Sequence, residues 1–174
     1  MSELRRLTSE YVDFEDRIRL TGEGEDGQRV ILWLTRRLLD RLVPHLVDWL
    51  AQHEPRAPDV LAHSVARSST YQRFEQEVAH HAFKPQPPVQ ARLGEPNWLV
   101  CTVELKSSPH VLRLLFKGRL ALENAQFNPG GKTLRQWLKV IHGAYLAAGW
   151  PTDVWPNWMH ESTPPQVGVP PAFH

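Results

Sequence analysis

Near its N-terminus the chain alternates apolar and polar residues with a period of two, which is typical of a half-buried β-strand. Over residues 11–20, Val12 and Phe14 share the apolar face of such a strand, and charged residues occupy most of the other face. The following segment, 21–28, holds three glycines and an Asp-Gly pair, which is a strong turn signal. The apolar residues 29–35 then supply a partner strand. The pattern therefore predicts a hairpin.

The period of the pattern then changes to that of a helix. Six apolar residues recur at helical spacing, namely Leu38, Leu39, Leu42, Leu46, Trp49 and Leu50. Thr35 is a suitable N-cap, and Pro44, which lacks a backbone donor, predicts a kink or a break into two short helices. A weaker apolar stripe predicts a second helix over about 59–83. The two helices form a helical insertion over about 36–83.

Strands return after the proline-rich linker 84–88. Alternation predicts four of them, over 89–93, 97–106, 110–117 and 119–127. A three-residue connection at Gly118 places Leu120 and Leu122 of the last strand on its apolar face.

The two clearest of these strands favour one register. Pairing Lys106 with Val111 brings Glu104 opposite Arg113 and gathers apolar side chains, Cys101 included, on the other face. The predicted core joins this face to the first helix. Its members are Cys101, Val103, Leu105, Leu112, Leu114, Phe116, Leu38, Leu42, Leu46 and Trp49.

A last helix is predicted over 134–148, with Thr133 as its N-cap and Gly149 closing it. Its apolar seam advances in alternating steps of four and three, at Leu134, Leu138, Ile141, Tyr145 and Ala148. Such a seam is typical either of packing on the protein's own sheet or of a helix pair in a dimer. The other side carries a basic stripe, which indicates a solvated face or, as an alternative, a nucleic-acid contact. This stripe consists of Lys132, Arg135 and Lys139.

These elements predict an α+β fold, with an antiparallel β-sandwich or half-barrel, a helical insertion between strands and a C-terminal helix. Strict alternation of strands and helices is missing, which excludes a doubly wound parallel sheet. Residues 1–149 are expected to form a single globular domain, followed over 150–174 by a partly docked Trp- and Pro-rich tail with a mobile end. Its tryptophans either fold back onto the domain or serve a partner. They are Trp150, Trp155 and Trp158.

The composition narrows the class of protein. Apolar residues make up 41% and charged residues 22% of the chain, which is typical of a globular protein. The formal net charge of +1 does not favour nucleic acid, membrane surfaces or acidic substrates as partners. A single cysteine excludes an internal disulfide and a cysteine-based zinc site. Residues 1–10 lack the apolar core of a signal peptide, and no apolar run is long enough to span a membrane. We therefore expect a cytoplasmic protein without a membrane partner.

Residues 126–133 (QFNPGGKT) lie between a strand and a helix, as a phosphate-binding loop does. However, Gln126 stands where such a loop has its first glycine, and Pro129 removes one of the N–H groups that would hold the phosphate. We therefore expect that Lys132 does not bind a nucleotide.

Other candidate chemistry is sparse. Glu77 and His81 lie one helical turn apart, but no second cluster adds metal ligands. Cys101 falls on the apolar face of its strand and is expected to be a buried, inert thiol. No catalytic residue, metal or cofactor is therefore predicted.

The last strands and the last helix resemble the globular head shared by the non-homologous end-joining scaffold proteins and the centriole assembly protein. The likeness is carried by VCTVELKSS, HVLRLLFKGRLALENAQF and KTLRQWLKVIHGAYLAA. It implies the fold of that head and a scaffold-like character. In that family the last helix continues as a dimeric coiled coil that binds the DNA ligase, whereas Gly149 and Pro151 end it here. The resemblance therefore implies no ligase site and carries over no functional residue.

These observations favour a non-catalytic protein-interaction or scaffold module, whose partner is a second copy in a homodimer or another protein. The alternative is a nucleic-acid-associated protein that uses the basic stripe, and a third hypothesis is an anion- or nucleotide-binding enzyme at the NPGGKT turn. Trp155 and Trp158 are the expected anchors of a homodimer. The candidate interaction residues are Trp150, Trp155, Trp158, Lys132, Arg135 and Lys139.

Overall fold

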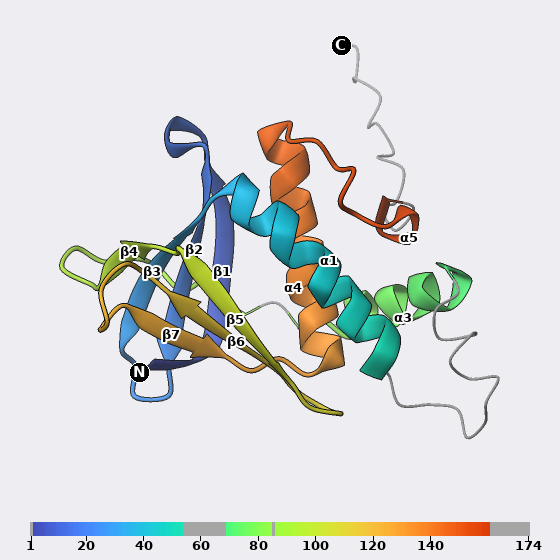
Figure 1. The fold of residues 1–174 in the computed structure, drawn as a ribbon, viewed down its shortest axis with the longest axis horizontal. Coiled ribbons are helices and arrows are strands. Elements are labelled where there is room, and N and C mark those ends of the chain that lie inside the picture. The colour runs from blue at the N-terminus through green and yellow to red at the C-terminus, as the bar shows by residue number, and fades with distance from the viewer. Residues whose placement is uncertain (1, 54–68, 85, 161–174) are drawn as a thin grey trace, which may run out of the picture.

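The computed structural model of the protein describes residues 2–53, 69–84 and 86–160 (Figure 1). Within them, seven strands form one sheet: β1 (Ser2–Val12), β2 (Arg17–Gly24), β3 (Arg29–Leu34), β4 (Asn97–Leu99), β5 (Thr102–Ser107), β6 (Leu112–Lys117) and β7 (Asn124–Phe127). The helices are α1 (Arg36–His53), α3 (Ser69–His81), α4 (Gly131–Ala148) and the short α5 (Asn157–His160), with a 3-10 turn at Asp13–Glu15. None of the described helices has the length and apolar character that crossing a membrane requires.

The sheet runs in the order β4-β3-β2-β1-β7-β6-β5. The pairs β1–β7 and β3–β4 are parallel, and the other neighbours are antiparallel. The α+β fold with helices inserted between β3 and β4 is confirmed, whereas the expectation of an all-antiparallel sheet is wrong. Both parallel pairs join segments far apart in the sequence, where no short turn imposes an antiparallel direction.

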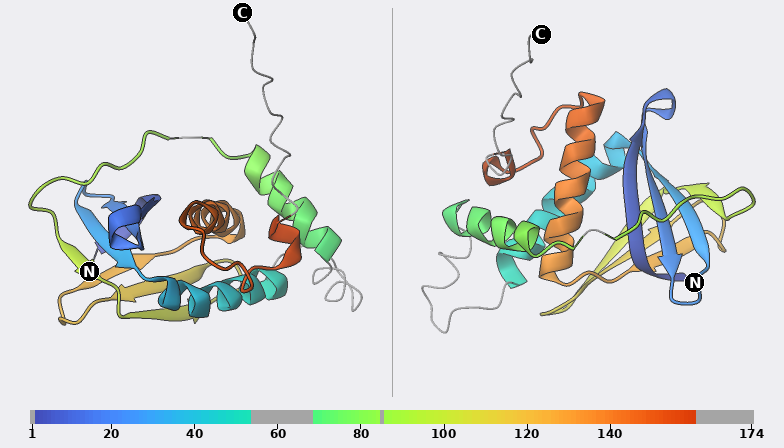
Figure 2. Two further views of the ribbon diagram at one scale, coloured as in Figure 1. Left: turned by 90° about the horizontal axis from the view of Figure 1, so that it is seen from above. Right: turned by 180° about the vertical axis from the view of Figure 1, so that it is seen from behind.

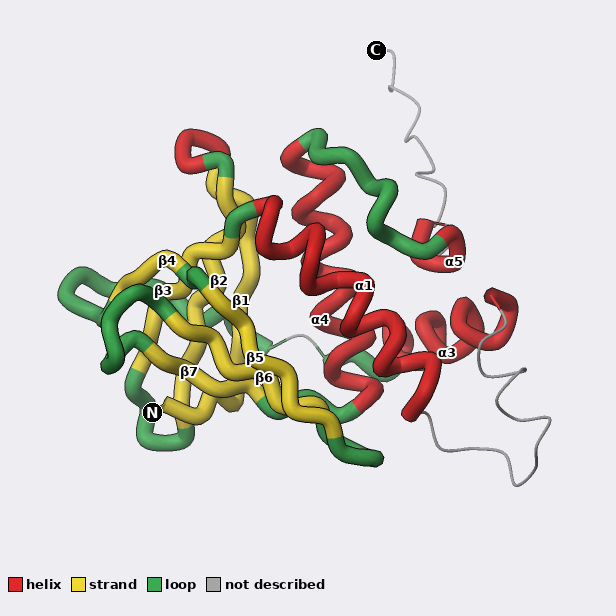
Figure 3. The backbone as a smooth tube through the Cα atoms, in the orientation of Figure 1, coloured by secondary structure: helices red, strands yellow, loops and turns green. Residues whose placement is uncertain are grey.

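The two edge strands, β4 and β5, follow each other in the chain and close the sheet at one corner. The N–H of Val100 donates to the carbonyl of Trp33 in β3 at 3.0 Å, and the N–H of Cys101 donates to the carbonyl of Lys117 in β6 at 2.8 Å. Two consecutive residues, Val100 and Cys101, thus connect β3 and β6, which lie next to opposite edges of the sheet. The strands therefore form a rolled, half-open barrel beside the helices (Figures 1 and 3).

The first hairpin turns earlier than predicted. β1 ends at Val12, and the chain reverses over residues 13–16, inside the predicted strand 11–20. Asp16 has a φ of 47°, a left-handed conformation that few residues other than Gly, Asn and Asp adopt. The alternating pattern of the sequence runs on across this tight turn. Phe14 lies in the turn and not in a strand, so its side chain is 88% exposed instead of buried. The glycine-rich turn that follows joins β2 to β3, as predicted.

The first predicted helix is continuous. The hydroxyl of Thr35 accepts a hydrogen bond from the Leu38 N–H at 3.2 Å, which confirms the predicted N-cap. The helix runs through Pro44 without interruption, so the predicted break is wrong. Buried side chains lie both before and after the proline, and this packing holds the helix together. Of the second predicted helix, over 59–83, α3 forms the last part, and residues 54–68 lie outside the described residues.

β5 and β6 pair two residues away from the predicted register. Val103 lies opposite Phe116, and Glu104 forms its ion pair with Lys117 rather than with the predicted partner. A shift of two residues keeps every side chain on its face, so the predicted apolar face is confirmed within these strands. Cys101 is the exception, because it lies at the corner before β5 and is exposed.

The connection between β6 and β7 also differs from the prediction. The N–H of Gly118 donates to the carbonyl of Glu123 at 2.8 Å and closes a loop before β7. Leu120 and Leu122, predicted to be inward-facing, therefore point into solvent. The segment 89–93 forms no strand and crosses the sheet as an irregular chain.

α4 lies at the centre of the molecule, with the sheet, α1 and the pair α3 and α5 on different sides of it (Figure 2). Most predicted core residues are buried. These are Leu112, Leu114, Phe116, Leu42, Leu46 and Trp49, with Val103, Leu105 and Leu38 partly buried against them.

The burial of Leu114 predicts a large effect on stability. Replacing Leu114, which is fully buried in β6, by Ala is expected to lower the free energy of unfolding by about 2–5 kcal/mol, because a cavity is left in the core. The matched change Leu122→Ala, in the exposed loop, is expected to alter it by less than about 0.5 kcal/mol. Urea unfolding of both variants measures the difference, and equal losses would contradict the packing described.

Candidate functional site

The predicted basic stripe of α4 is not a surface feature. Arg135 is only 1% exposed, because α3 lies over it. Its Nη2 donates to Gln72 Oε1 at 2.6 Å, and its guanidinium lies 5.6 Å from the ring centre of Trp158. Lys132 is exposed and Lys139 is half-buried. The prediction of a solvent-exposed basic stripe is therefore wrong at Arg135. Helical spacing alone does not show which face of a helix is covered by another helix of the fold.

The apolar seam of α4 is used within the chain. Leu134, Leu138, Ile141 and Tyr145 are buried in the common core, so the alternative of packing on the protein's own elements is correct. That seam is not available to a second copy. A homodimer through another face stays a prediction.

The three tail tryptophans are also buried, which confirms that this part of the tail folds back. Trp150 Nε1 donates to Asp16 Oδ1 at 2.8 Å, and the same oxygen accepts the Tyr11 hydroxyl at 3.0 Å. These two hydrogen bonds lower the pKa of Asp16. Trp155 packs edge-on against Tyr145 at 5.3 Å between ring centres. Trp150, Trp155 and Trp158 are thus part of the core, and Trp155 and Trp158 are not exposed anchors of a dimer. The expected mobile end, 161–174, lies outside the described residues.

The docking of this segment predicts that Trp155→Ala lowers the free energy of unfolding by about 3–5 kcal/mol, because the indole is almost completely buried. Phe14→Ala, at an exposed aromatic of the same fold, is expected to change it by less than about 0.5 kcal/mol. Thermal and urea unfolding of the two variants provide the measurement. A Trp155→Ala protein as stable as the parent would show that the segment does not pack as described.

His142 on α4 predicts a pH dependence of stability. It is 4% exposed beside Trp155 and His160, and burial, followed by the charges of His160 and Lys139, lowers its pKa from 6.5 to about 4. Between these pH values the unfolded chain binds a proton that the folded chain does not, so stability falls as the pH drops from about 6.5 to 4. The loss reaches about 3 kcal/mol. We expect His142→Phe to reduce the slope of stability against pH in this window, and an unchanged slope would contradict this.

The NPGGKT turn does not have the form of a phosphate loop. α4 already begins at Gly131, with Gly130 in the N-cap position, so Thr133 lies inside the helix and is not its cap. Asn128 Nδ2 donates to Glu3 Oε1 at 3.2 Å, which places a carboxylate beside the turn. That negative charge opposes binding of a phosphate there. The absence of nucleotide binding at Lys132 stays a prediction.

Metal binding and a serine–histidine contact are the two other candidates for chemistry. In the part of the chain that the structure describes, no three His, Cys, Asp or Glu side chains gather as a metal site would require. Ser107 Oγ lies 3.2 Å from His53 Nε2, and His53 Nδ1 lies 3.1 Å from the Trp49 carbonyl, an order that resembles a nucleophile and its base. The same Ser107 Oγ accepts the Trp49 Nε1–H at 3.0 Å, and the nearby N–H groups of Ser108 and Val111 are bonded within the hairpin. This cluster therefore ties the end of α1 to β5.

An open apolar groove, which we call the α4 groove, lies between α4, β1 and Phe83, two residues beyond the end of α3. Its larger hollow, of about 140 Å³, is lined among others by Leu7, Ser9, Phe83, Trp137 and Val140. A second hollow, of about 110 Å³, adjoins it and shares Phe83 and Val140. Trp137 forms the floor and donates its Nε1–H to Ser9 Oγ at 3.1 Å. The walls are open to solvent, because Phe83 is 46% and Val140 42% exposed.

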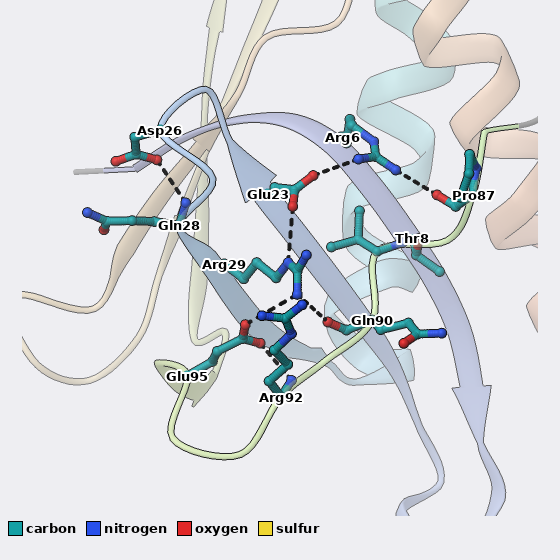
Figure 4. Close-up of polar contacts among 11 residues, drawn as sticks. Arg6, Thr8, Glu23, Asp26, Gln28, Arg29, Pro87, Gln90, Arg92 and Glu95 are labelled. Atoms are coloured by element: carbon teal, nitrogen blue, oxygen red, sulfur yellow. Dashed lines mark hydrogen bonds and ion pairs between the residues drawn. The ribbon is translucent and has the colours of Figure 1, made fainter.

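The linker between α3 and β4 positions this wall of the groove by crossing the outer face of β1–β3 as a strap (Figure 4). Arg6 bridges Glu23 and the Pro87 carbonyl, both at 2.7 Å. The N–H of Val89 donates to Thr8 Oγ1 at 2.8 Å. Because the strap is fixed at these points, the chain that leaves α3 is held over the N-terminal half of α4 (Figure 2).

The electrostatics of the α4 groove are positive. α4 contains no acidic residue, and no residue lining either hollow is acidic. Arg5, which also pairs with Glu3 and Glu25, lines the larger hollow, and Lys139 lines the smaller one. Burial lowers the pKa of Lys139, while Glu77 partly opposes the shift. The groove therefore favours an occupant with negative charge beside an apolar group.

Gln76 lines the smaller hollow and ties α3 to α4. It is 1% exposed, and its Nε2 donates to the Arg135 carbonyl at 3.1 Å. Its Oε1 is buried without a hydrogen-bond partner among the described residues. Because that oxygen is buried, it is not open to an occupant of the hollow.

Sequence reasoning missed the α4 groove. Phe83 falls at the end of a weakly patterned helix, and Val140 lies outside the apolar seam. The packing of α3 runs against its apolar pattern, because its buried face carries Gln72 and Gln76 while Phe74 points outward.

No family model matches the chain, and neither the curated proteins nor the solved structures contain a match to it. The resemblance to the end-joining scaffold heads therefore stays a prediction.

Proposed function

We propose that the protein is a non-catalytic interaction module whose α4 groove binds an apolar side chain of another polypeptide. The groove carries this proposal, because it combines an aromatic floor and two half-exposed apolar walls on one open face. Interaction sites in proteins commonly use such a concave apolar centre with a polar rim.

The positive charge of this face is better suited to an acidic polypeptide than to nucleic acid. Only two cations of the predicted basic stripe reach the surface, Lys132 and Lys139, and Arg135 is occupied inside the fold. Binding to a phosphate backbone depends on several surface cations, each neutralising one phosphate. An apolar hollow contributes little to such binding but much to docking a side chain.

Capture from an extract of the native host, with paired variants, tests the proposal. Val140→Asp places a carboxylate in the groove, and Leu146→Asp makes the same change at an exposed position of α4 that lines neither hollow. We expect a partner that is retained by the parent and by Leu146→Asp and is reduced at least about tenfold by Val140→Asp. Circular dichroism and melting temperature confirm that both variants fold.

Two results would contradict the proposal. One is a set of retained proteins that does not differ between Val140→Asp and Leu146→Asp. The other is salt-sensitive binding of duplex DNA by the purified protein that Lys132→Glu abolishes and Val140→Asp leaves unchanged.

A further inference from the structure

We propose that a second copy of this chain fills the α4 groove with its β1–β2 turn, residues 13–16, and that Phe14 enters the hollows between Phe83 and Val140. The inference rests on the proposed function, because it names one occupant of the same groove. It assigns self-association to two different surfaces of the chain, an acidic tip and a basic groove.

The tip has the form of a preorganised apolar anchor. Phe14 is exposed at the end of the β1–β2 hairpin and lies between the exposed carboxylates of Asp13 and Glu15. The left-handed conformation of Asp16 is held by hydrogen bonds from Tyr11 and Trp150 to one carboxylate oxygen. A strained turn that is fixed by two buttressing side chains loses little conformational entropy on binding.

The tip and the groove complement each other in charge. Asp13 and Glu15 flank the aromatic ring, and Glu15 also pairs with Arg17 at 3.6 Å, while Arg5 and Lys139 line the groove. Two other exposed apolar tips of the chain lack this pattern. Leu93 follows Arg92, and Leu122 follows Ala121, so neither has carboxylates on both sides.

The geometry determines the form of the assembly. Because tip and groove are different surfaces of one chain, each copy can bind one neighbour at its tip and another at its groove. Such contacts form chains or rings, or a symmetric pair in which each copy inserts its tip into the groove of the other. A single loop seated in a groove buries less than the area of a stable interface, about 1,200 Å² or more, so the association is expected to be weak.

Sedimentation equilibrium of the full chain and two variants tests the inference. At concentrations up to about 400 µM and low salt, the parent is expected to show an average mass that rises with concentration. Phe14→Ser, without the anchor, and Val140→Asp, with a blocked groove, are each expected to remain monomeric. An equimolar mixture of the two variants retains one intact tip and one intact groove, so it is expected to form a heterodimer that grows no further.

Matched controls and the opposing results make the test decisive. Leu122→Ser and Leu146→Asp change exposed apolar residues outside both surfaces and are expected to associate like the parent. A parent that is monomeric throughout, association that survives Phe14→Ser, or a variant mixture that stays monomeric would each overturn the inference. The proposed function is judged separately: a partner from the host that Val140→Asp loses and Phe14→Ser retains would support docking by the groove even where self-association fails.

Discussion

The burial of α4 between several unlike neighbours is the constraint on which the rest of the structure depends. Its apolar seam packs on the sheet, where Trp137 contacts Phe127 edge-on at 5.9 Å between ring centres. On the α1 side, the Tyr145 hydroxyl donates to Asp40 at 2.8 Å, and this hydrogen bond, together with burial, raises the pKa of Tyr145. On the α3 side, Arg135 is held by Gln72. These contacts leave α4 one open face, and that face forms the groove.

The same burial links the two surfaces proposed to associate. Trp150, which follows α4, donates to Asp16 and so supports the turn that carries Phe14. Nearer the middle of the helix, Val140 and Trp137 line the groove. One element therefore positions the groove directly and the tip through a hydrogen bond. An interaction module needs rigid surfaces, and a helix packed on most of its sides provides them.

The sequence predicted those parts of the fold that depend on local periodicity. The hairpin partner at β3, the N-cap at Thr35 and the seam of α4 were all recovered, because burial on one face of a strand or helix leaves a regular pattern. Errors arose where tertiary contacts override such patterns. Pro44 lies within α1 because packing on both sides of it outweighs its local cost. Phe14 fits the alternating pattern of a strand, but it lies in a turn that Trp150, far along the chain, stabilises.

The candidate site was less predictable than the fold for a similar reason. The predicted interaction residues were chosen because they are aromatic or basic, but the fold uses Trp155, Trp158 and Arg135 internally. The groove instead depends on Phe83, which comes just before a strap held to β1 by Arg6 and Thr8, more than seventy residues away in sequence. A contact between residues so far apart in the sequence leaves no periodic pattern that could predict it.

Disulfide trapping between two single-cysteine variants tests the central claim most directly. In a Cys101→Ser background, Phe14→Cys places a thiol at the tip and Val140→Cys places one in the groove. A disulfide requires Cα atoms closer than about 7 Å, so a cross-link reports the proposed contact even in a weak complex. Mixing the two variants under mild oxidation is predicted to yield a covalent heterodimer faster than Val140→Cys mixed with Leu122→Cys. Equal rates for the two mixtures would contradict the account.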